Sequence, residues 1–468
     1  MTKEVVLVYP PYGDLVTEAE GILEPLALTY IAGYLKKYDI PVSVIDITPE
    51  NISLEEFAEI IKKKNPKIVG IYANVPLVMK AVKVAEAVKA VGKDIKVVVG
   101  GHQATALARE SLEAFSCFDV MVIGEGEQTM LELVGELEKD LPDPHKINGI
   151  AFRENNKVVI TPKRALISDL DSIPFPAREL INFSNYRPAT KAYYSNPFAT
   201  MITSRGCPYH CVFCAYGKGT CRLRSPQNVI EEIGGLVQKY KIKSILFYDD
   251  TLTFDKERLT EICGLIIKNK FNINWTCYSR VNAADFDLLR KMKEAGCRLI
   301  SYGAESGSQR MLNIMKKGTT IEQIKKAVEF TKKAGIQTSA SYVLGIPGET
   351  SESINETIEF AKRLNTTYAH FNMVTPWPGT ELYEQLLKSG MIAKDIWKQY
   401  AQKLGMHIPT VDLDGLTMDE LGRVSQRAYK QFYLRPQKIW ELARSGASFF
   451  KLKSYLLAFK AFLRIRAQ

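Results

Sequence analysis

The sequence predicts an α/β protein in which a doubly wound parallel sheet is followed by a partial barrel of six β/α units and a small helical region at the carboxyl end. Short β-branched segments alternate with helix-like segments in the first third of the chain, and the alternation returns after about residue 197. Strands that alternate with helices form parallel sheets. Towards the carboxyl end this alternation gives way to helical, basic and apolar sequence.

The expected domain limits are 1–140 for the first sheet, 141–195 for a linker, 196–410 for the barrel and 411–468 for the helical region. A chain of 468 residues is long enough for two or three domains. The linker is indicated by a polar, proline-bearing stretch at 169–178.

Composition restricts the functional classes. The chain is 46% hydrophobic and 24% charged, as in globular domains, and no apolar run reaches the roughly eighteen residues of a membrane span. Lysine and arginine are spread along the chain despite a net charge of +10, so no nucleic-acid partner is expected. The amino terminus lacks the pattern of a signal peptide, and scattered single cysteines suit a reducing compartment. We therefore expect a cytoplasmic protein.

The first domain is expected to be Rossmann-like, with glycine-rich loops after its strands. Its strands are predicted at Val5–Tyr9, Val42–Asp46, Ile68–Tyr72, Ile95–Val99 and Val120–Ile123, with helices at Leu54–Lys64 and Val78–Val91. Ligands of such sheets bind beyond the carboxyl ends of the strands. No G-x-G-x-x-G motif follows the first strand, which disfavours a nicotinamide or flavin dinucleotide. Alternatively, the glycines only make tight turns.

The second half is expected to form a TIM-like partial barrel. Its strands are predicted at Phe198–Thr203, Ser244–Tyr248, Ile273–Tyr278, Arg298–Ala304, Gln337–Leu344 and Tyr368–Val374. The helices between them are predicted at Pro226–Tyr240, Lys256–Asn269, Ala284–Ala295, Ile321–Ala334 and Ser351–Leu364. The active site of a β/α barrel lies at the carboxyl ends of its strands. Polar or glycine residues follow these strands at Asp249, Asp250, Arg280, Glu305, Ser306, Gly345 and Gly348.

The most specific motif is the C-x3-C-x2-C triad Cys207, Cys211 and Cys214, which follows the first barrel strand. Three thiolates can hold three corners of a cubane 4Fe-4S cluster and leave one iron open for another ligand. A zinc site completed by Cys221 or His210 is the alternative. Zinc knuckles usually pair two short cysteine hooks, and the sequence has no second hook.

The triad and the barrel-edge residues together resemble the radical S-adenosylmethionine domain across residues 197–385. This resemblance implies a 4Fe-4S cluster on the three cysteines and S-adenosylmethionine on the open iron. Phe213 would contact the adenine, and Asp249 and Asp250 would bind the methionine amino group, although the family's usual Gly-Gly-Glu is absent. The resemblance also implies S-adenosylmethionine contacts from Arg280, Glu305, Ser306, Gly345 and Gly348. No catalytic side chain beyond the cluster loop is predicted.

The first domain resembles the cobalamin-binding domain of cobalamin-dependent radical S-adenosylmethionine enzymes. The resemblance lies in Tyr-Pro-Pro-Tyr12, Gly-Gly-His-Gln-Ala-Thr105 and Ile-Gly-Glu-Gly-Glu127, in this order ahead of the triad. It implies cobalamin contacts from Tyr12, Gly100, Gly101, His102, Gly124 and Gly126. The D-x-H-x-x-G motif that gives cobalt a histidine ligand is absent, and Asp143-Pro-His145 copies only part of it. Cobalt is therefore expected to lack a protein histidine, with His102 as an alternative contact.

The resemblance extends to the methylase-type branch, to the anaerobic magnesium-protoporphyrin ester cyclase and to hopanoid-type radical enzymes. It implies reductive cleavage of S-adenosylmethionine and methyl transfer to an unactivated carbon. Radical cyclisation or carbon coupling in tetrapyrrole or hopanoid and lipid biosynthesis is an alternative. A tRNA methylthiotransferase and a non-enzymatic corrinoid or metal sensor are the others. The expected partners are a small-molecule or lipid-like substrate and an electron donor such as flavodoxin or ferredoxin.

The carboxyl-terminal segment Ser448–Arg466 is basic and strongly apolar. Lys453, Lys460 and Arg464 fall on one helical face, and apolar side chains fill another. This pattern is typical of a helix that lies in a membrane interface. It is equally typical of a helix that packs on its own barrel. The first interpretation would place the protein at the inner face of the membrane as a peripheral protein and would favour a lipid-like substrate.

Overall fold

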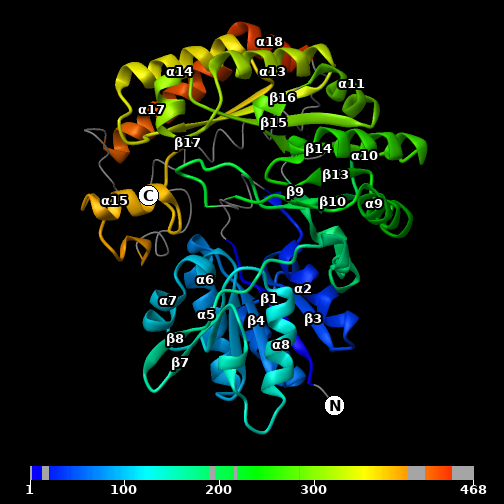
Figure 1. The fold of residues 1–468 in the computed structure, drawn as a ribbon, viewed down its shortest axis with the longest axis vertical. Helices are drawn as coiled ribbons and strands as arrows, with labels where there is room; N and C mark the ends of the chain where they lie inside the picture. Colours follow the sequence, from blue (N-terminus) through cyan, green and yellow to red (C-terminus); the bar gives the residue numbers. More distant parts are fainter. Residues whose placement is uncertain are drawn as a thin grey trace. The chain divides into compact units, whose positions relative to one another are not determined.

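The computed structural model describes residues 3–12, 21–188, 195–215, 219–283, 285–398 and 417–444. The chain divides into two compact units (Figure 1). One unit comprises Met1–Arg187 with Asp395–His407, and the other comprises Pro188–Lys394 with Ile408–Gln468. Within the described residues no helix is both long and apolar enough to cross a membrane.

The first unit contains a seven-stranded sheet with the order β3-β1-β4-β5-β6-β7-β8. Its strands are β1 (Val5–Tyr9), β3 (Val42–Asp46), β4 (Ile68–Tyr72), β5 (Lys96–Gly100), β6 (Val120–Val122), β7 (Ile150–Glu154) and β8 (Lys157–Ile160). The strands from β3 to β6 in this order pair in parallel. The main helices are α2 (Leu26–Lys37), α4 (Leu54–Lys64), α5 (Val78–Val91), α6 (His102–Ala106), α7 (Ala108–Ala114) and α8 (Glu127–Leu137).

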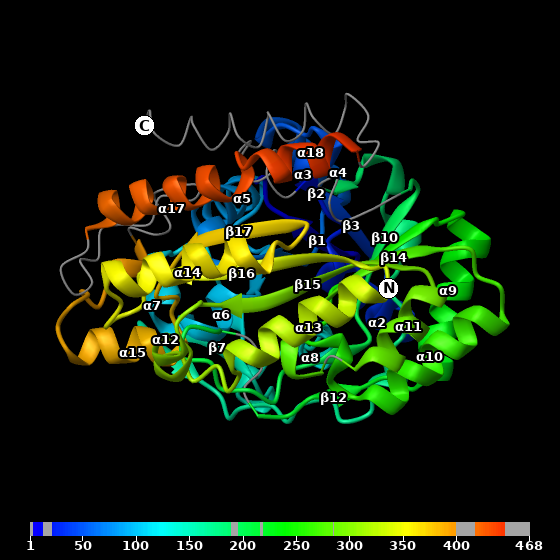
Figure 2. The same ribbon diagram turned by 90° about the horizontal axis from the view of Figure 1, so that it is seen from above.

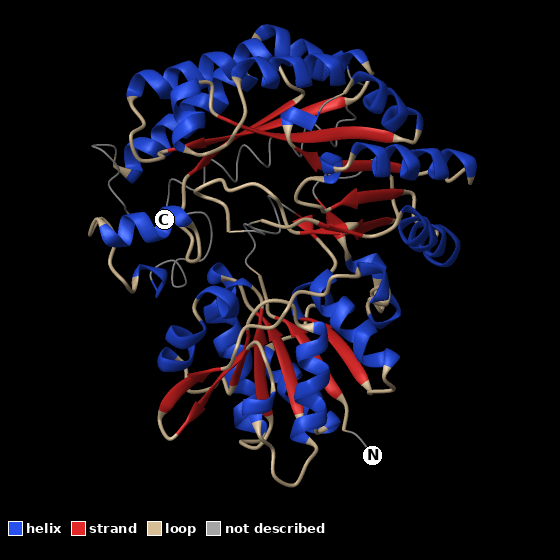
Figure 3. Cartoon of the chain, viewed as in Figure 1, coloured by secondary structure: helices blue, strands red, loops and turns tan. Residues whose placement is uncertain are grey.

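Helices flank the parallel strands of this sheet (Figure 3), as a doubly wound fold requires. α2 packs beside α8, α4 packs beside α5, and apolar residues of α2 and α8 join the core over the strands. This arrangement confirms the predicted fold class of the first half. The helix α2, whose first turn follows Pro25, was not among the predicted elements.

The segment 141–195, predicted to be a linker, contains β7 and β8. These two strands extend the sheet by antiparallel pairing at one edge (Figure 1). The turn between them is Asn155-Asn156, and both residues have positive φ, 48° and 61°, as a two-residue type I′ hairpin requires. Ile150, Ala151 and Phe152 are buried, so this hairpin is part of the core of the first unit.

The second unit contains a six-stranded parallel sheet with the order β10-β13-β14-β15-β16-β17. Its strands are β10 (Phe198–Met201), β13 (Ser244–Phe247), β14 (Asn274–Ser279), β15 (Cys297–Glu305), β16 (Gln337–Leu344) and β17 (Tyr368–Met373). Its main helices are α9 (Pro226–Tyr240), α10 (Lys256–Lys268), α11 (Phe286–Glu294), α12 (Gln309–Ile314), α13 (Ile321–Lys333), α14 (Ser351–Leu364) and α15 (Glu381–Lys388). Helices α13 and α14 lie over β15 to β17 (Figures 1 and 2). The six predicted β/α units are confirmed, with strand ends that differ by one or two residues.

The helical region begins with α17 (Met418–Tyr433) and α18 (Pro436–Arg444). The tyrosine hydroxyls of α17 accept hydrogen bonds from the edge strand β17: Ala369 N donates to Tyr433 Oη at 2.9 Å, and Phe371 N donates to Tyr429 Oη at 3.2 Å. An exposed edge strand can pair with a strand of another chain, and α17 covers the edge strand β17. The predicted interfacial helix at Ser448–Arg466 lies outside the described residues.

A buried ion pair holds the irregular segment after β8 to the first unit. Arg178 Nε lies 2.9 Å from Glu24 Oε2, and the two side chains are only 3% and 2% exposed. Next to this pair, Ala177 N donates to the carbonyl oxygen of Thr29 in α2 at 2.8 Å. Because a buried charge without its partner is costly, this pair makes the segment an obligatory part of the fold.

We predict that Arg178→Met lowers the free energy of unfolding by about 3 kcal/mol, since it removes the cation that compensates the buried Glu24 carboxylate. Lys36→Met is the matched control, because Lys36 pairs with Glu179 and the two side chains are 44% and 38% exposed. The control should change the free energy of unfolding by less than about 1 kcal/mol. Urea unfolding followed by circular dichroism measures both values, and equal effects would contradict the assignment.

Candidate active site

The cysteine triad lies on a loop that a short hairpin closes. β11 (Ser204–Arg205) pairs antiparallel with β12 (Arg222–Leu223), so both ends of the loop meet at the carboxyl end of β10. Gly206 has φ +92°, and a Cβ there would lie 2.2 Å from the carbonyl oxygen of Thr220. Glycine is therefore required where the two ends of the loop approach each other. Gly219 N donates to the carbonyl oxygen of Cys207 at 3.1 Å and closes the loop further.

The three triad residues are free cysteines; Cys211 is buried, while Cys207 and Cys214 are partly exposed. Cys214 N donates to the carbonyl oxygen of Cys211 at 3.1 Å, and the turn so formed contains the partly exposed Phe213. Three sulfur donors on one loop fit the iron-sulfur cluster that the sequence predicts. Among the described residues no group of three His, Cys, Asp or Glu side chains is arranged to hold a metal ion. The cluster site is therefore a proposal.

A line of contacts runs from the triad to the ends of β14 and β15. Arg280 follows β14, and its Nη1 lies 3.5 Å from Cys211 Sγ. Its Nη2 donates to the carbonyl oxygen of Lys317, whose ammonium lies 2.8 Å from Glu305 Oε1. All four side chains are buried. The structure thus brings Cys211, Arg280 and Glu305 together, as the sequence predicts. Lys317, which completes the line, was not predicted.

Two other predicted contacts are engaged within the fold. Asp249 is fully buried, and its Oδ1 accepts hydrogen bonds from the backbone N and the hydroxyl of Thr203, both at 2.9 Å, and from the Ser204 hydroxyl. Burial raises the pKa of Asp249 above its usual range. Ser306 is also fully buried, and its hydroxyl lies 3.0 Å from the Thr357 hydroxyl. Asp250 is the exposed member of the predicted acidic pair.

The loop after β16 contains the predicted residues Gly345 and Gly348, with φ of +89° and +83°. At Gly345 a Cβ would lie 2.7 Å from Leu421 of α17, so glycine permits this packing. Glu349 folds back and accepts a hydrogen bond from Gly345 N, and burial raises the pKa of Glu349 to about 7. Sequence reasoning missed Glu349, although an acidic residue directly after the second glycine is a visible signal for a loop-closing carboxyl.

Tyrosine rings gather at the carboxyl ends of β1 and β4 in the first unit. The rings of Tyr9 and Tyr72 stack at 4.8 Å, and Tyr12 meets Tyr9 edge to face at 5.5 Å. Tyr12 N also donates to Thr48 Oγ1 at 2.9 Å. The chain order reverses between β1 and β4, and the crevice beside such a reversal is the usual ligand site of doubly wound sheets. The sequence indicated Tyr12 but not the pairing of Tyr9 with Tyr72.

The predicted glycine loops follow β5 and β6 at the same edge of the sheet. At Gly101, which has φ +103° and precedes His102 at the start of α6, a Cβ would lie 2.5 Å from the carbonyl oxygen of Ala73. By contrast, a Cβ at Gly124 (φ +87°) would meet no described atom within 4 Å, and one at Gly100 would meet only Val122 at 4.0 Å. The open space beside Gly100 and Gly124 suits the close approach of a large flat ligand such as cobalamin.

Gly126 serves helix packing, because a Cβ there would lie 2.9 Å from the Ile31 side chain of α2. His145 is engaged elsewhere: its Nε2 lies 3.0 Å from Glu154 Oε1, and its ring meets that of Phe152 at 5.1 Å. Because Phe152 pairs with Val120, the first residue of β6, these contacts lie away from the carboxyl edge. His145 therefore lies away from the glycine loops predicted to contact cobalamin, and the absence of a histidine ligand to cobalt stays a prediction.

Asp46, at the end of β3, is a buried carboxyl that forms no ion pair with any described residue. Tyr186 donates its hydroxyl to Asp46 Oδ2 at 3.2 Å, and Asp46 N donates to Glu50 Oε1 at 3.0 Å. Asp46 Oδ1 and the Tyr12 hydroxyl are buried and find no hydrogen-bond partner among the described residues. Burial, with Glu50 nearby, raises the pKa of Asp46 to about 8, so this carboxyl is largely neutral at pH 7.

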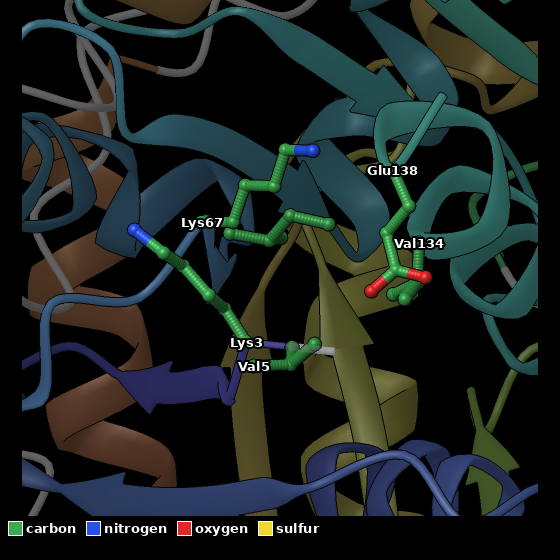
Figure 4. Close-up of a pocket in the computed structure, with 6 residues that line it drawn as sticks. Lys3, Val5, Lys67, Val134 and Glu138 are labelled. Carbon is green, nitrogen blue, oxygen red and sulfur yellow. The ribbon is translucent and has the colours of Figure 1, made fainter. Parts of the chain in front are cut away.

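The cavity drawn in Figure 4 lies at the opposite edge of the sheet, around the amino ends of β1 and β4. It is lined by Lys3, Val5, Lys67, Ile68, Val134 and Glu138. Its volume of about 10 Å³ is enough for roughly one water molecule. This cavity is therefore not the candidate active site.

Comparisons with known proteins agree with this geometry. The family model of the radical SAM superfamily matches residues 201–361, and that of the B12 binding domain matches residues 12–134. An uncharacterized methyltransferase from Pyrococcus horikoshii is 36% identical over 439 residues, which cover 93% of each chain. The anaerobic magnesium-protoporphyrin IX monomethyl ester cyclase of Rubrivivax gelatinosus is 33% identical over 392 residues, 82% of this chain and 70% of the relative.

A solved structure shares the fold. The radical S-adenosylmethionine methyltransferase TsrM from Kitasatospora setae, solved with cobalamin and a 4Fe-4S cluster bound, matches with a TM-score of 0.70 at 18% identity, covering 83% of this chain and 78% of that chain. The class is therefore that of radical S-adenosylmethionine enzymes with a cobalamin-binding domain. This chain belongs to the radical SAM superfamily and carries a B12 binding domain, so its cofactors are a 4Fe-4S cluster, S-adenosylmethionine and cobalamin.

We predict that Asp46→Asn makes the first unit more stable at pH 8 than the wild type. The folded wild type keeps its proton up to about pH 8, whereas the unfolded chain releases it near pH 4, so wild-type stability falls as the pH rises between these values. Asparagine is neutral throughout, so the difference in the free energy of unfolding between the variant and the wild type should grow by about 1.4 kcal/mol for each pH unit between these two values. Urea unfolding at pH 5 and pH 8 measures it, with exposed Asp94→Asn as the control. Parallel pH profiles would contradict the prediction.

Proposed function

We propose that the chain methylates an unactivated carbon of a small molecule in a cobalamin-dependent radical reaction. The observation that carries the proposal is that one chain contains both a three-thiol loop at the carboxyl edge of the second sheet and glycine loops with open space at the carboxyl edge of the first. The relative that is 36% identical over 93% of this chain is named a methyltransferase. We assign the cobalamin site to residues 1–140 and the radical site to residues 196–410.

Each part of the radical site has a distinct role in this proposal. Cys207, Cys211 and Cys214 would hold three irons, and the fourth would take S-adenosylmethionine. When bound, the cluster supplies the electron that cleaves S-adenosylmethionine, and cobalamin supplies the methyl group. The loop at Gly345–Gly348, closed by Glu349, presents backbone groups to the adenine. The exposed Asp250 is the better placed of the two acids for the methionine amino group.

The cobalamin would lie on the loops that follow β1, β5 and β6. Gly100 and Gly124 leave room for a ring to approach the backbone, and Tyr12 borders the crevice. Gly124 N donates to Thr105 Oγ1 at 3.1 Å, which links two of these loops. A protein histidine below cobalt is not part of the proposal, since His145 is held by Glu154.

We predict that Cys211→Ser and Cys214→Ser lose cleavage of S-adenosylmethionine by at least a hundredfold, because two thiolates cannot hold the cluster. Cys221→Ser is the matched control. Burial, with Asp249 and Cys207 nearby, raises the pKa of the Cys221 thiol to about 11, so in the absence of a bound metal it is protonated at pH 7. Iron content and 5′-deoxyadenosine formation after anaerobic reconstitution measure the effect. Loss of metal in the Cys221→Ser variant, with zinc in the wild type, would support the zinc alternative instead.

Radical cyclisation is the second candidate, favoured by 33% identity to the magnesium-protoporphyrin cyclase over 82% of this chain. The mass of the product separates the two functions. Methylation adds the mass of one methylene group to the substrate, and cyclisation does not. Incubation with S-adenosylmethionine labelled in its methyl group therefore decides between them: label in the product supports methylation, and an unlabelled cyclised product refutes it.

We also propose a lipid-like substrate, a flavodoxin or ferredoxin as electron donor, and peripheral contact of the carboxyl-terminal segment with the inner face of the membrane. The basic, apolar pattern of Ser448–Arg466 supports the proposed membrane contact.

We predict that the full chain sediments with anionic liposomes at low salt and that a chain ending at residue 444 does not. Equal sedimentation of both chains would contradict the proposed contact.

A further inference from the structure

We infer that Arg280 acts on the iron-sulfur site through the Cys211 sulfur: its fixed positive charge raises the reduction potential of the cluster, and its planar head group holds the cysteine loop in place. Sequence resemblance assigned Arg280 to S-adenosylmethionine instead. The inference rests on the proposed cluster at Cys207, Cys211 and Cys214.

Two contacts join Arg280 to the triad loop. Its Nη1 lies 3.5 Å from Cys211 Sγ, and its guanidinium carbon lies 3.6 Å from the ring centroid of Tyr209, two residues earlier in the loop. Asn282, two residues after Arg280, donates from Nδ2 to the Tyr209 hydroxyl at 3.2 Å. Residues 280–282, directly after β14, therefore contact both the ring face and the hydroxyl of Tyr209. Arginine suits this place because its planar head group stacks on aromatic rings while its edges donate hydrogen bonds.

The charge of Arg280 is not neutralised by a carboxylate. Its Nη2 donates to the backbone carbonyl of Lys317, and its Nε finds no partner among the described residues. The nearby Glu305 pairs with the Lys317 ammonium at 2.8 Å, so these two charges balance each other. Arg280 is 5% exposed, and water screens its charge little. The positive charge that faces the Cys211 sulfur is therefore uncompensated within the described part of the second unit.

Charge balance gives the direction of the effect. A reduced cluster carries one more negative charge than an oxidised cluster, and a fixed cation beside a ligand sulfur stabilises the reduced form more. Hydrogen bonds to ligand sulfurs and the net charge around them are established determinants of cluster potentials. Arginine keeps its charge at every accessible pH, so the effect is permanent. Arg280 is in this sense a positioning and tuning residue, which acts through the thiolate.

The test compares Arg280→Gln, Arg280→Lys and Arg298→Gln in the full chain after anaerobic reconstitution. Arg298 is the matched control: it loses the same charge, but it lies at the start of β15, where its Nε donates to Asn274 Oδ1 at 2.6 Å. Iron content and an electron paramagnetic resonance titration without S-adenosylmethionine are measured for each. We expect Arg280→Gln to have about tenfold less reduced cluster at a fixed potential, a shift of about 59 mV to lower values. Arg280→Lys should shift less, and Arg298→Gln should not shift.

An unchanged potential in iron-loaded Arg280→Gln, together with weaker binding of S-adenosylmethionine, would overturn the inference and support the assignment from resemblance. If Arg280→Gln retains no iron, Arg280→Lys decides. A potential of iron-loaded Arg280→Lys close to that of the wild type supports the charge role. Loss of iron from both variants with intact circular dichroism would show that the site requires the planar head group and would overturn the charge role. A wild-type chain without a 4Fe-4S signal would instead refute the proposed function.

Discussion

Parallel pairing of the strands is the constraint on which the candidate sites depend. The carboxyl ends of parallel strands lie at the same edge of a sheet. Strand pairing alone therefore brings together the loops after β10, β14, β15 and β16. The hairpin β11–β12 then folds the cysteine loop onto that edge, and Gly206 permits its closure. The same rule brings the loops after β1, β5 and β6 together in the first unit. In each unit the topology of the sheet therefore gathers the candidate cofactor loops at the carboxyl edge.

Buried charges impose a second constraint on the radical site. Arg280, Lys317 and Glu305 are all buried, and charges in the interior are tolerated only when they are paired or hydrogen bonded. The Lys317–Glu305 pair accounts for two of them. Arg280 contacts a backbone carbonyl, the Cys211 sulfur and the face of Tyr209, while its Nε finds no partner among the described residues. Glu305 has φ +62°, next to a register shift between β15 and β16. This bulge changes the direction of the last residues of β15, where the Glu305 carboxylate pairs with Lys317.

Local patterns predicted most of the fold, and long-range contacts account for what they missed. The alternation of short β-branched segments with helix-like segments predicted the parallel strands and most of the main helices, and the spacing of Cys207, Cys211 and Cys214 predicted the triad. The hairpin β7–β8 fell within the predicted linker because that prediction followed the polar, proline-bearing stretch at 169–178, and the turn Asn155-Asn156 was not used as a hairpin signal. Lys317 and Tyr72 were missed because each meets its partner only after the strands have paired. No spacing rule along the chain reports such contacts.

Several predicted cofactor contacts also hold the fold, and this limits how substitutions there can be interpreted. Asp249 orients Thr203 and Ser204 at the base of the cysteine loop, and Gly345 makes room for Leu421. Loss of activity after Asp249→Ala would follow equally from a displaced loop and from a lost ligand contact. Since residues that act as a unit give non-additive effects, activity alone cannot assign a role. Cluster content and potential, measured without S-adenosylmethionine, separate the support of the loop from the binding of the cofactor.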